Sequence, residues 1–224
     1  MNKNAGNESQ SKRKNFKALV EKLDKKGLTI FEVDGIYRTQ NIEYDGKKSA
    51  ALALFSPKTS KQKGRWNGAK VTIPMTYVAM KPGSALVETF SHIIPDFKAR
   101  RFYEDADLES REMSCVEFKE PLKLIGVRKL ALGKLCLSSQ DIEGDEVYDT
   151  TQSLMDALYL RFGDEYNGII FSSRWSGDEL DCAALWSHPE IANKQQIPLK
   201  DFVHDENDIY EILDQYQFIF NQTS

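Results

Sequence analysis

NGIIFSSRW, residues 167–175, joins an apolar run to two hydroxyl side chains, a cation and an indole. The apolar part, residues 168–173, is typical of a buried strand. Such a strand would deliver its terminal Ser-Ser-Arg to the edge of a sheet. Taken alone the pattern is weak, because serine at a strand end is usually a turn residue. The fold therefore has to be inferred from what surrounds this strand.

The surrounding sequence alternates clusters of short strands with few helices. A helix is predicted over residues 150–162, where Leu154, Leu158 and Phe162 share one face, and a strand over residues 182–186. Further helices are predicted at 16–27, 84–95 and 208–220, and further strands at 28–33, 36–40, 51–55, 76–80, 113–118, 122–127 and 134–139. A turn is expected at Asp34-Gly35, a loop at 56–68 and irregular chain at 96–110. The order lacks regular strand–helix alternation, which favours an α+β domain with antiparallel or mixed sheets.

Length and composition indicate one globular domain. The chain has 224 residues, of which 41% are hydrophobic and 29% charged, close to ordinary globular proportions. Residues 1–14 are polar and predict a disordered tail, which leaves residues 15–224 as a single domain.

Charge and residue content exclude several classes of function. The net charge is −4, with 30 Lys and Arg against 34 Asp and Glu, so a bulk attraction to nucleic acid is not expected. No apolar run approaches the about 20 residues that span a bilayer, and the N-terminus does not resemble a secretory signal. We expect a cytoplasmic protein with no membrane contact. The three cysteines and three histidines lie far apart, which favours free thiols and predicts no metal site.

Two motifs offer groups that suit an anionic, aromatic ligand. Arg65 lies between glycines in GRWNG, residues 64–68, where its planar fork could meet a phosphate without crowding. Tyr77 lies in the strand TYVAM, residues 76–80, and offers a flat ring and a hydroxyl. A solvated loop arginine and an ordinary core tyrosine are the competing interpretations, and local sequence favours them.

A carboxylate follows at Glu88, in the helix that begins near Ser84. At 100° per residue it points away from the apolar stripe of Leu86, Phe90 and Ile93. The competing interpretation is a solvated helix residue. The glutamate becomes a functional candidate only if that face of the helix borders a cleft.

In this order the motifs resemble the RES domain, a family named for its Arg, Glu and Ser. The resemblance covers roughly residues 35–190. It rests on GRWN (64–67), YVA (77–79), ALVE (85–88) and NGIIFSSR (167–174), with IYR (36–38), TQ (151–152) and AALW (183–186) as further matches.

The resemblance implies a toxin of a bacterial toxin–antitoxin pair, with an Xre-type antitoxin as partner and a homodimer left open. It implies an ADP-ribosyltransferase-like core of two packed mixed or antiparallel sheets with flanking helices. Its substrate would be NAD⁺, cleaved at the nicotinamide–ribose bond by a glycohydrolase or phosphorylase. Alternatives are an ADP-ribosyltransferase that modifies a protein and a non-catalytic interaction protein.

Carried over to this chain, the family's catalytic residues fall on Glu88, Arg65, Tyr77 and Ser173, although Ser172 is adjacent. Three of them, with a less certain second arginine, would bind NAD⁺: Arg65, Tyr77, Ser173 and Arg38. A carboxylate near the ribose suits an oxocarbenium-like transition state, and the arginines suit the pyrophosphate.

Overall fold

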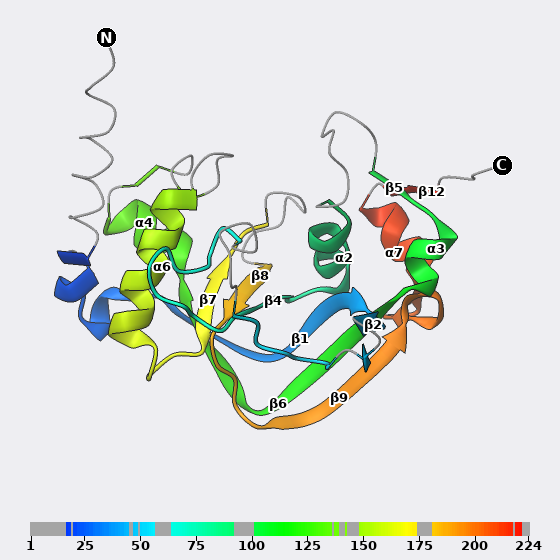
Figure 1. Cartoon of the computed structure of the whole chain (residues 1–224), viewed down its shortest axis with the longest axis horizontal. Coiled ribbons are helices and arrows are strands. Elements are labelled where there is room, and N and C mark those ends of the chain that lie inside the picture. Colours follow the sequence, from blue (N-terminus) through cyan, green and yellow to red (C-terminus); the bar gives the residue numbers. More distant parts are fainter. Residues whose placement is uncertain are drawn as a thin grey trace, which may run out of the picture.

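The computed structural model describes residues 17–220, except 19, 45–46, 49, 57–63, 92–100, 136, 139–141, 143–147, 174–180 and 217. It confirms the α+β class (Figure 1). The helical elements are η1 (Lys25–Gly27), α2 (Pro82–Ser91), α3 (Asp105–Glu109), α4 (Val127–Gly133), α6 (Tyr148–Phe162), η3 (Leu199–Asp201) and α7 (Ile209–Gln215). The strands are β1 (Ile30–Asn41), β2 (Glu43–Tyr44), β3 (Lys47–Lys48), β4 (Thr76–Ala79), β5 (Arg101–Tyr103), β6 (Arg111–Gly126), β7 (Gly168–Phe171), β8 (Cys182–Leu185), β9 (Ile191–Pro198), β10 (Val203–His204), β11 (Asn207–Asp208) and β12 (Phe218–Phe220).

One six-stranded sheet organises the molecule, in the order β1-β4-β8-β7-β6-β9. Because β1 also pairs with β6, five of these strands close into a ring and β9 continues the sheet outside it. The pairing of β6 with β7 is parallel, and the other pairings within this sheet are antiparallel. Figure 1 shows the helices in two groups at opposite sides of the view, α4 with α6 and α2 with α3 and α7.

The two longest strands correct the prediction of four shorter ones. The predicted strands at 28–33 and 36–40 are both part of β1, and those at 113–118 and 122–127 are both part of β6. The ladder between them jumps from the pair Val33–Leu122 to the pair Gly35–Glu117, so one residue of β1 faces four of β6. The expected turn at Asp34-Gly35 is therefore a bulge. Pro121 lies in the extra segment of β6, where its missing N–H interrupts no pair with β1.

The predicted helix at 150–162 is confirmed as α6, and its three predicted core residues, Leu154, Leu158 and Phe162, are buried. The predicted helix at 84–95 begins two residues earlier, at Pro82, a residue favoured in the first turn because it lacks a backbone N–H. Its predicted end at Pro95 lies outside the described residues. None of the helices in the described ranges is long and apolar enough to cross a membrane.

Short elements account for the remaining errors. The predicted strand at 51–55 is a turn in which Phe55 alone forms a bridge, with Met75. The described start of the predicted strand at 134–139 is a turn after α4, while the segment 96–110, expected to be irregular, contains β5 and α3. The predicted helix at 208–220 stops at Gln215, because β12 pairs instead with the distant β5. Strands β2, β3, β9, β10 and β11 were not predicted, and the expected tail at 1–14 lies outside the described residues.

Candidate functional site

A cavity of about 440 Å³ lies where β1, β4, α2 and the ends of β7 and β8 converge. Four of the five site residues predicted from sequence line it: Arg38, Arg65, Tyr77 and Glu88. They come from three different elements and one loop, so only the folded chain brings them together. The volume of the cavity falls within the range of small-molecule binding pockets.

The loop that carries Arg65 is fastened to the first turns of α6. The Thr151 hydroxyl donates to the Arg65 carbonyl at 2.7 Å, and the Gln152 amide donates to the Gly64 carbonyl at 3.1 Å. Further along, the Asp156 carboxylate accepts the backbone N–H groups of residues 70 and 71. These bonds hold the arginine backbone in place before any ligand binds. They also give a structural role to the TQ match at 151–152.

The Arg65 side chain lies against two aromatic rings, which also contact each other with a centroid distance of 5.4 Å. Its guanidinium carbon is 5.3 Å from the ring centroid of Trp66 and 5.3 Å from that of Phe171. A cation over an aromatic face is attracted by the ring quadrupole, and the two rings restrict the rotation of the planar group. Trp66 is buried, so this loop is a packed part of the core, which argues against the solvated-loop interpretation of Arg65.

Tyr77 presents its ring to the cavity while its hydroxyl is turned inward. The hydroxyl accepts from the Trp66 N–H at 3.1 Å and donates to Asn67 Oδ1 at 3.2 Å, and the same Asn67 oxygen accepts from Gly64 N at 2.6 Å. Burial of this hydroxyl raises the pKa of Tyr77 well above its ordinary value, so it stays protonated. A Cβ on Gly64 would lie 2.7 Å from the hydroxyl oxygen, which explains the glycine before Arg65.

Glu88 is half-buried on the face of α2 that borders the cavity. The Ser173 hydroxyl donates a hydrogen bond to Glu88 Oε1, and Ser173 N in turn donates to the buried Asp181 carboxylate at 2.8 Å. Ser173 is itself buried, and among the described residues the cavity wall includes Glu88 and not Ser173.

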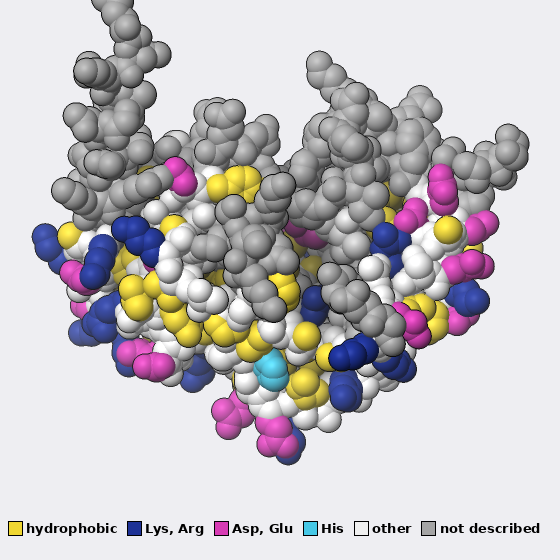
Figure 2. Space-filling view, viewed as in Figure 1, with side chains coloured by type: hydrophobic (Ala, Val, Ile, Leu, Met, Phe, Trp, Pro, Cys, Tyr) yellow, Lys and Arg dark blue, Asp and Glu magenta, His cyan; other side chains and the backbone are white. Residues whose placement is uncertain are grey.

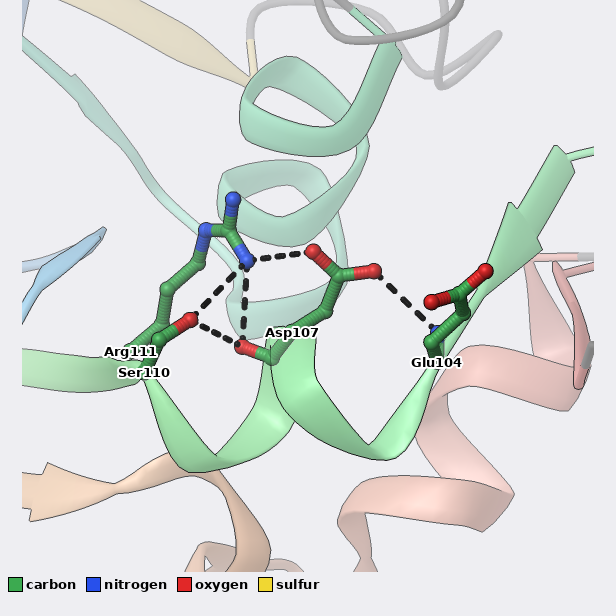
Figure 3. A network of polar contacts seen from close by, with 4 residues as sticks. All are labelled: Glu104, Asp107, Ser110 and Arg111. Atoms are coloured by element: carbon green, nitrogen blue, oxygen red, sulfur yellow. Dashed lines mark hydrogen bonds and ion pairs between the residues drawn. The ribbon is translucent and has the colours of Figure 1, made fainter. Parts of the chain in front are cut away.

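The opposite side of α2 is supported by the network in Figure 3. The Arg111 guanidinium lies 5.1 Å from the Phe90 ring centroid and forms an ion pair with Asp107 at 2.6 Å. Asp107 also accepts from the Glu104 N–H at 3.1 Å, which closes the first turn of α3. The contact between Arg111 and Phe90 joins α3 and the start of β6 to the side of α2 that faces away from the cavity.

Arg38 is the second cation of the cavity. It lies on β1, and its Nη1 atom is buried with no hydrogen-bond partner within the described part of the chain. Burial lowers the pKa of Arg38 from its ordinary value, although a guanidinium remains charged at neutral pH. A buried donor without a partner carries a free-energy cost, which an anionic ligand in the cavity would remove.

Cys182 also lines the cavity, at the start of β8. Burial raises the pKa of its thiol well above the ordinary value, and the negative charges of Glu88 and Asp181 act in the same direction. The group is therefore a neutral thiol, which is a poor nucleophile. In the described ranges, no cluster of three or more His, Cys, Asp or Glu side chains could hold a metal ion.

Several residues of the site were not predicted from sequence. Asn67 stands within a quoted motif but had no assigned role, and Phe171 was assigned only to a buried strand. Phe55, Tyr148 and Asp181 carried no local signal, since each acquires its place from a bridge, a helix start or a contact across the sheet.

The chain belongs to the RES domain family, which matches residues 36–205. It is similar in structure to a chain of the crystal structure of the M.tuberculosis MbcT–MbcA toxin–antitoxin complex, with a TM-score of 0.51 and 15% sequence identity over 81% of this chain and 91% of that chain. At that identity the likeness shows a shared fold. A comparison with curated proteins gave no match.

Proposed function

We propose that the chain is a toxin-type enzyme that cleaves the nicotinamide–ribose bond of NAD⁺, on an ADP-ribosyltransferase-like core. The observation that carries the proposal is the convergence of Arg38, Arg65, Tyr77 and Glu88 on one cavity. These are the residues that the family resemblance assigns to NAD⁺ chemistry. Membership of the RES domain family supports the same conclusion.

The chemistry requires a carboxylate beside the reacting ribose. As the bond between ribose C1 and the nicotinamide nitrogen breaks, its electron pair leaves with nicotinamide, which becomes neutral, and the ribose becomes oxocarbenium-like. Glu88 stabilises that developing positive charge. Water then adds at C1 and loses a proton, or phosphate adds instead, giving ADP-ribose or its 1-phosphate. Since the leaving group departs neutral, no strong general acid is needed.

The other residues bind and position. Arg65 and Arg38 hold the pyrophosphate, for which a planar guanidinium provides paired donors, and the ring of Tyr77 contacts nicotinamide. The family resemblance placed Ser173 among the residues that bind NAD⁺. The hydrogen bond from its hydroxyl to Glu88 supports a different role, in which Ser173 orients the carboxylate.

A protein partner forms part of the proposal. The structural likeness to a chain of a toxin–antitoxin complex supports an antitoxin that binds this chain, and the family resemblance makes that antitoxin Xre-type. Such a partner would restrain NAD⁺ cleavage until it is removed.

The direct test is incubation of the purified chain with NAD⁺, with and without phosphate, followed by chromatography of the products. Nicotinamide should appear in both reactions. ADP-ribose would identify water as the acceptor, and a phosphorylated ADP-ribose would identify phosphate. Intact NAD⁺ after long incubation at high protein concentration, with no antitoxin present, would contradict the proposal.

Arg65→Lys should weaken NAD⁺ binding measurably. The substitution keeps the positive charge but removes the planar guanidinium, which can donate paired bonds and lies against two aromatic rings. The expected loss is about 1–3 kcal/mol, the scale of a charge-assisted hydrogen bond left unmade, as read by calorimetry. Arg161→Lys is the matched control, because Arg161 lies 5.3 Å from the Phe162 ring centroid but is exposed on α6. Equal affinity in wild type and Arg65→Lys would place Arg65 outside the binding site.

A further inference from the structure

Exposed aromatic side chains gather around the cavity. Phe55, Tyr77 and Tyr148 have exposed fractions of 51%, 38% and 39%, and all three line it. Tyr210 is also exposed, and it does not line the cavity. Figure 2 shows hydrophobic side chains gathered across the middle of one face, between flanks that carry most of its charged side chains. Side chains that are exposed and also line a cavity lie where the cavity opens to solvent.

The backbones that carry the two most exposed rings are fixed. Phe55 N donates to Met75 O at 2.7 Å, and Met75 N donates to Phe55 O at 2.9 Å, so this bridge ties the loop to the strand β4 that follows. Tyr148 is the first residue of α6, and the Thr151 hydroxyl, which donates to the Arg65 carbonyl, lies 3.3 Å from the Tyr148 carbonyl. Apolar surface presented on an ordered backbone can bind a ligand with little loss of conformational entropy.

The charges in the same cavity narrow the class of ligand. Arg38 and Arg65 suit phosphate groups, and flat rings suit a nucleobase, since every base has a face that stacks on an aromatic side chain. The Tyr77 hydroxyl is hydrogen-bonded to residues 66 and 67, next to Arg65, and its ring lies in the same cavity wall as Glu88. Phe55 and Tyr148 line the same cavity and supply aromatic surface beyond what one nicotinamide ring requires.

We propose that Phe55 and Tyr148 form a second base subsite, which binds the adenine end of the dinucleotide. The inference rests on the proposed NAD⁺ activity and adds a substrate preference to it. Nicotinamide mononucleotide carries the bond to be broken but has no second base, so it cannot use this subsite. The chain should therefore prefer the dinucleotide. Because stacking contacts the face of the base and not its edge, guanine should replace adenine with little loss.

The test compares nicotinamide release from NAD⁺ and from nicotinamide mononucleotide. In the wild type, kcat/KM should favour NAD⁺. Phe55→Ala and Tyr148→Leu should each lower the ratio of the two kcat/KM values about tenfold, the scale of one lost stacking contact. Phe55→Trp, which keeps a ring, should retain the ratio. Tyr210→Ala is the control, an exposed aromatic residue away from the cavity, and should leave the ratio unchanged.

Two kinetic outcomes would refute the proposal that Phe55 and Tyr148 form a base subsite. An unchanged ratio in Phe55→Ala and Tyr148→Leu would mean that the rings do not contact the second base. Equal losses on both substrates would mean that the rings support the fold or the reacting centre. A partner protein that uses this aromatic surface would also leave the substrate ratio unchanged.

A binding measurement with ADP-ribose tests the base subsite independently of the proposed NAD⁺ cleavage. ADP-ribose carries the adenine and the pyrophosphate but no nicotinamide, so its affinity can be measured by calorimetry without any turnover. Phe55→Ala should weaken ADP-ribose binding about tenfold relative to the binding of inorganic pyrophosphate. If the wild type releases no nicotinamide, the proposed function fails. If ADP-ribose binds no more tightly than pyrophosphate, the base subsite fails, whatever the activity.

Discussion

Glu88→Gln is expected to lower the turnover of NAD⁺ by about 100- to 1,000-fold while NAD⁺ still binds. This is the scale of removing one electrostatic group that acts on the transition state. The carboxylate stabilises positive charge that develops on the ribose only as the bond breaks, so its loss should appear in kcat and not in affinity. Glutamine keeps the shape, and its amide oxygen can still accept the hydrogen bond from Ser173.

The matched control is Glu120→Gln, the same change at an exposed position on β6. Both variants should melt within a few degrees of the wild type, because a glutamine fits each position. Single-turnover kinetics with a separate binding measurement distinguish loss of chemistry from loss of affinity. Full NAD⁺ cleavage by a well-folded Glu88→Gln protein would refute the proposed mechanism. It would mean that Glu88 has no catalytic role and serves only as the hydrogen-bond partner of Ser173.

The sequence predicted which residues gather at the cavity better than it predicted the strands around it. Arg65, Tyr77 and Glu88 could be selected because an ordered set of motifs resembled a family, although local patterns favoured ordinary structural roles for each. Only the structure could show that the face of α2 that carries Glu88 borders a cavity. The same holds for the hydrogen bonds from Ser173 to Glu88 and to Asp181. These bonds join a helix, the end of one strand and the start of another, which lie far apart in the sequence.

The strand errors have a common physical cause. Periodicity reports which residues face the core but does not report where a strand ends. Pro121 and Gly35 look like breaks, yet the bulge between β1 and β6 accommodates both within continuous strands. Strand β12 and its partner β5 are three residues each. Their pairing joins segments more than 100 residues apart, which a local pattern cannot reveal.

Gly168→Ala is expected to lower the free energy of unfolding more than Phe55→Ala, Tyr210→Ala or Gly133→Ala. Gly168 begins β7 and is paired with Leu124 of β6 on one side and Leu185 of β8 on the other. A Cβ built there would lie 2.3 Å from the Ala184 backbone oxygen and 3.0 Å from the Leu185 Cα. Both are backbone atoms at the centre of the sheet, so no side-chain rotation can relieve the overlap.

The strand cannot easily shift to make room, because Asn167 is anchored on both sides. Its N–H donates to Lys123 O at 2.9 Å, its carbonyl accepts from Trp186 N at 2.9 Å, and its side-chain oxygen accepts from Lys123 N at 2.9 Å. Overpacking in a close-packed interior typically costs about 1–3 kcal/mol. With backbone on the opposing side and a fixed neighbour, we expect Gly168→Ala to reach the upper end of that range or exceed it.

Gly133→Ala supplies the matched control, because an added Cβ there meets nothing within 4 Å at the end of α4. Alanine favours helix over glycine by about 0.5–1 kcal/mol in a helix interior, so this variant should be as stable as the wild type or slightly more so. Urea unfolding should show a lower midpoint for Gly168→Ala at an unchanged m-value. Equal midpoints for Gly168→Ala and Gly133→Ala would mean that β7 and β8 can separate without cost. In that case the close packing at Gly168 would not be needed to hold β7 in place, nor to position Ser173, which follows β7, beside Glu88.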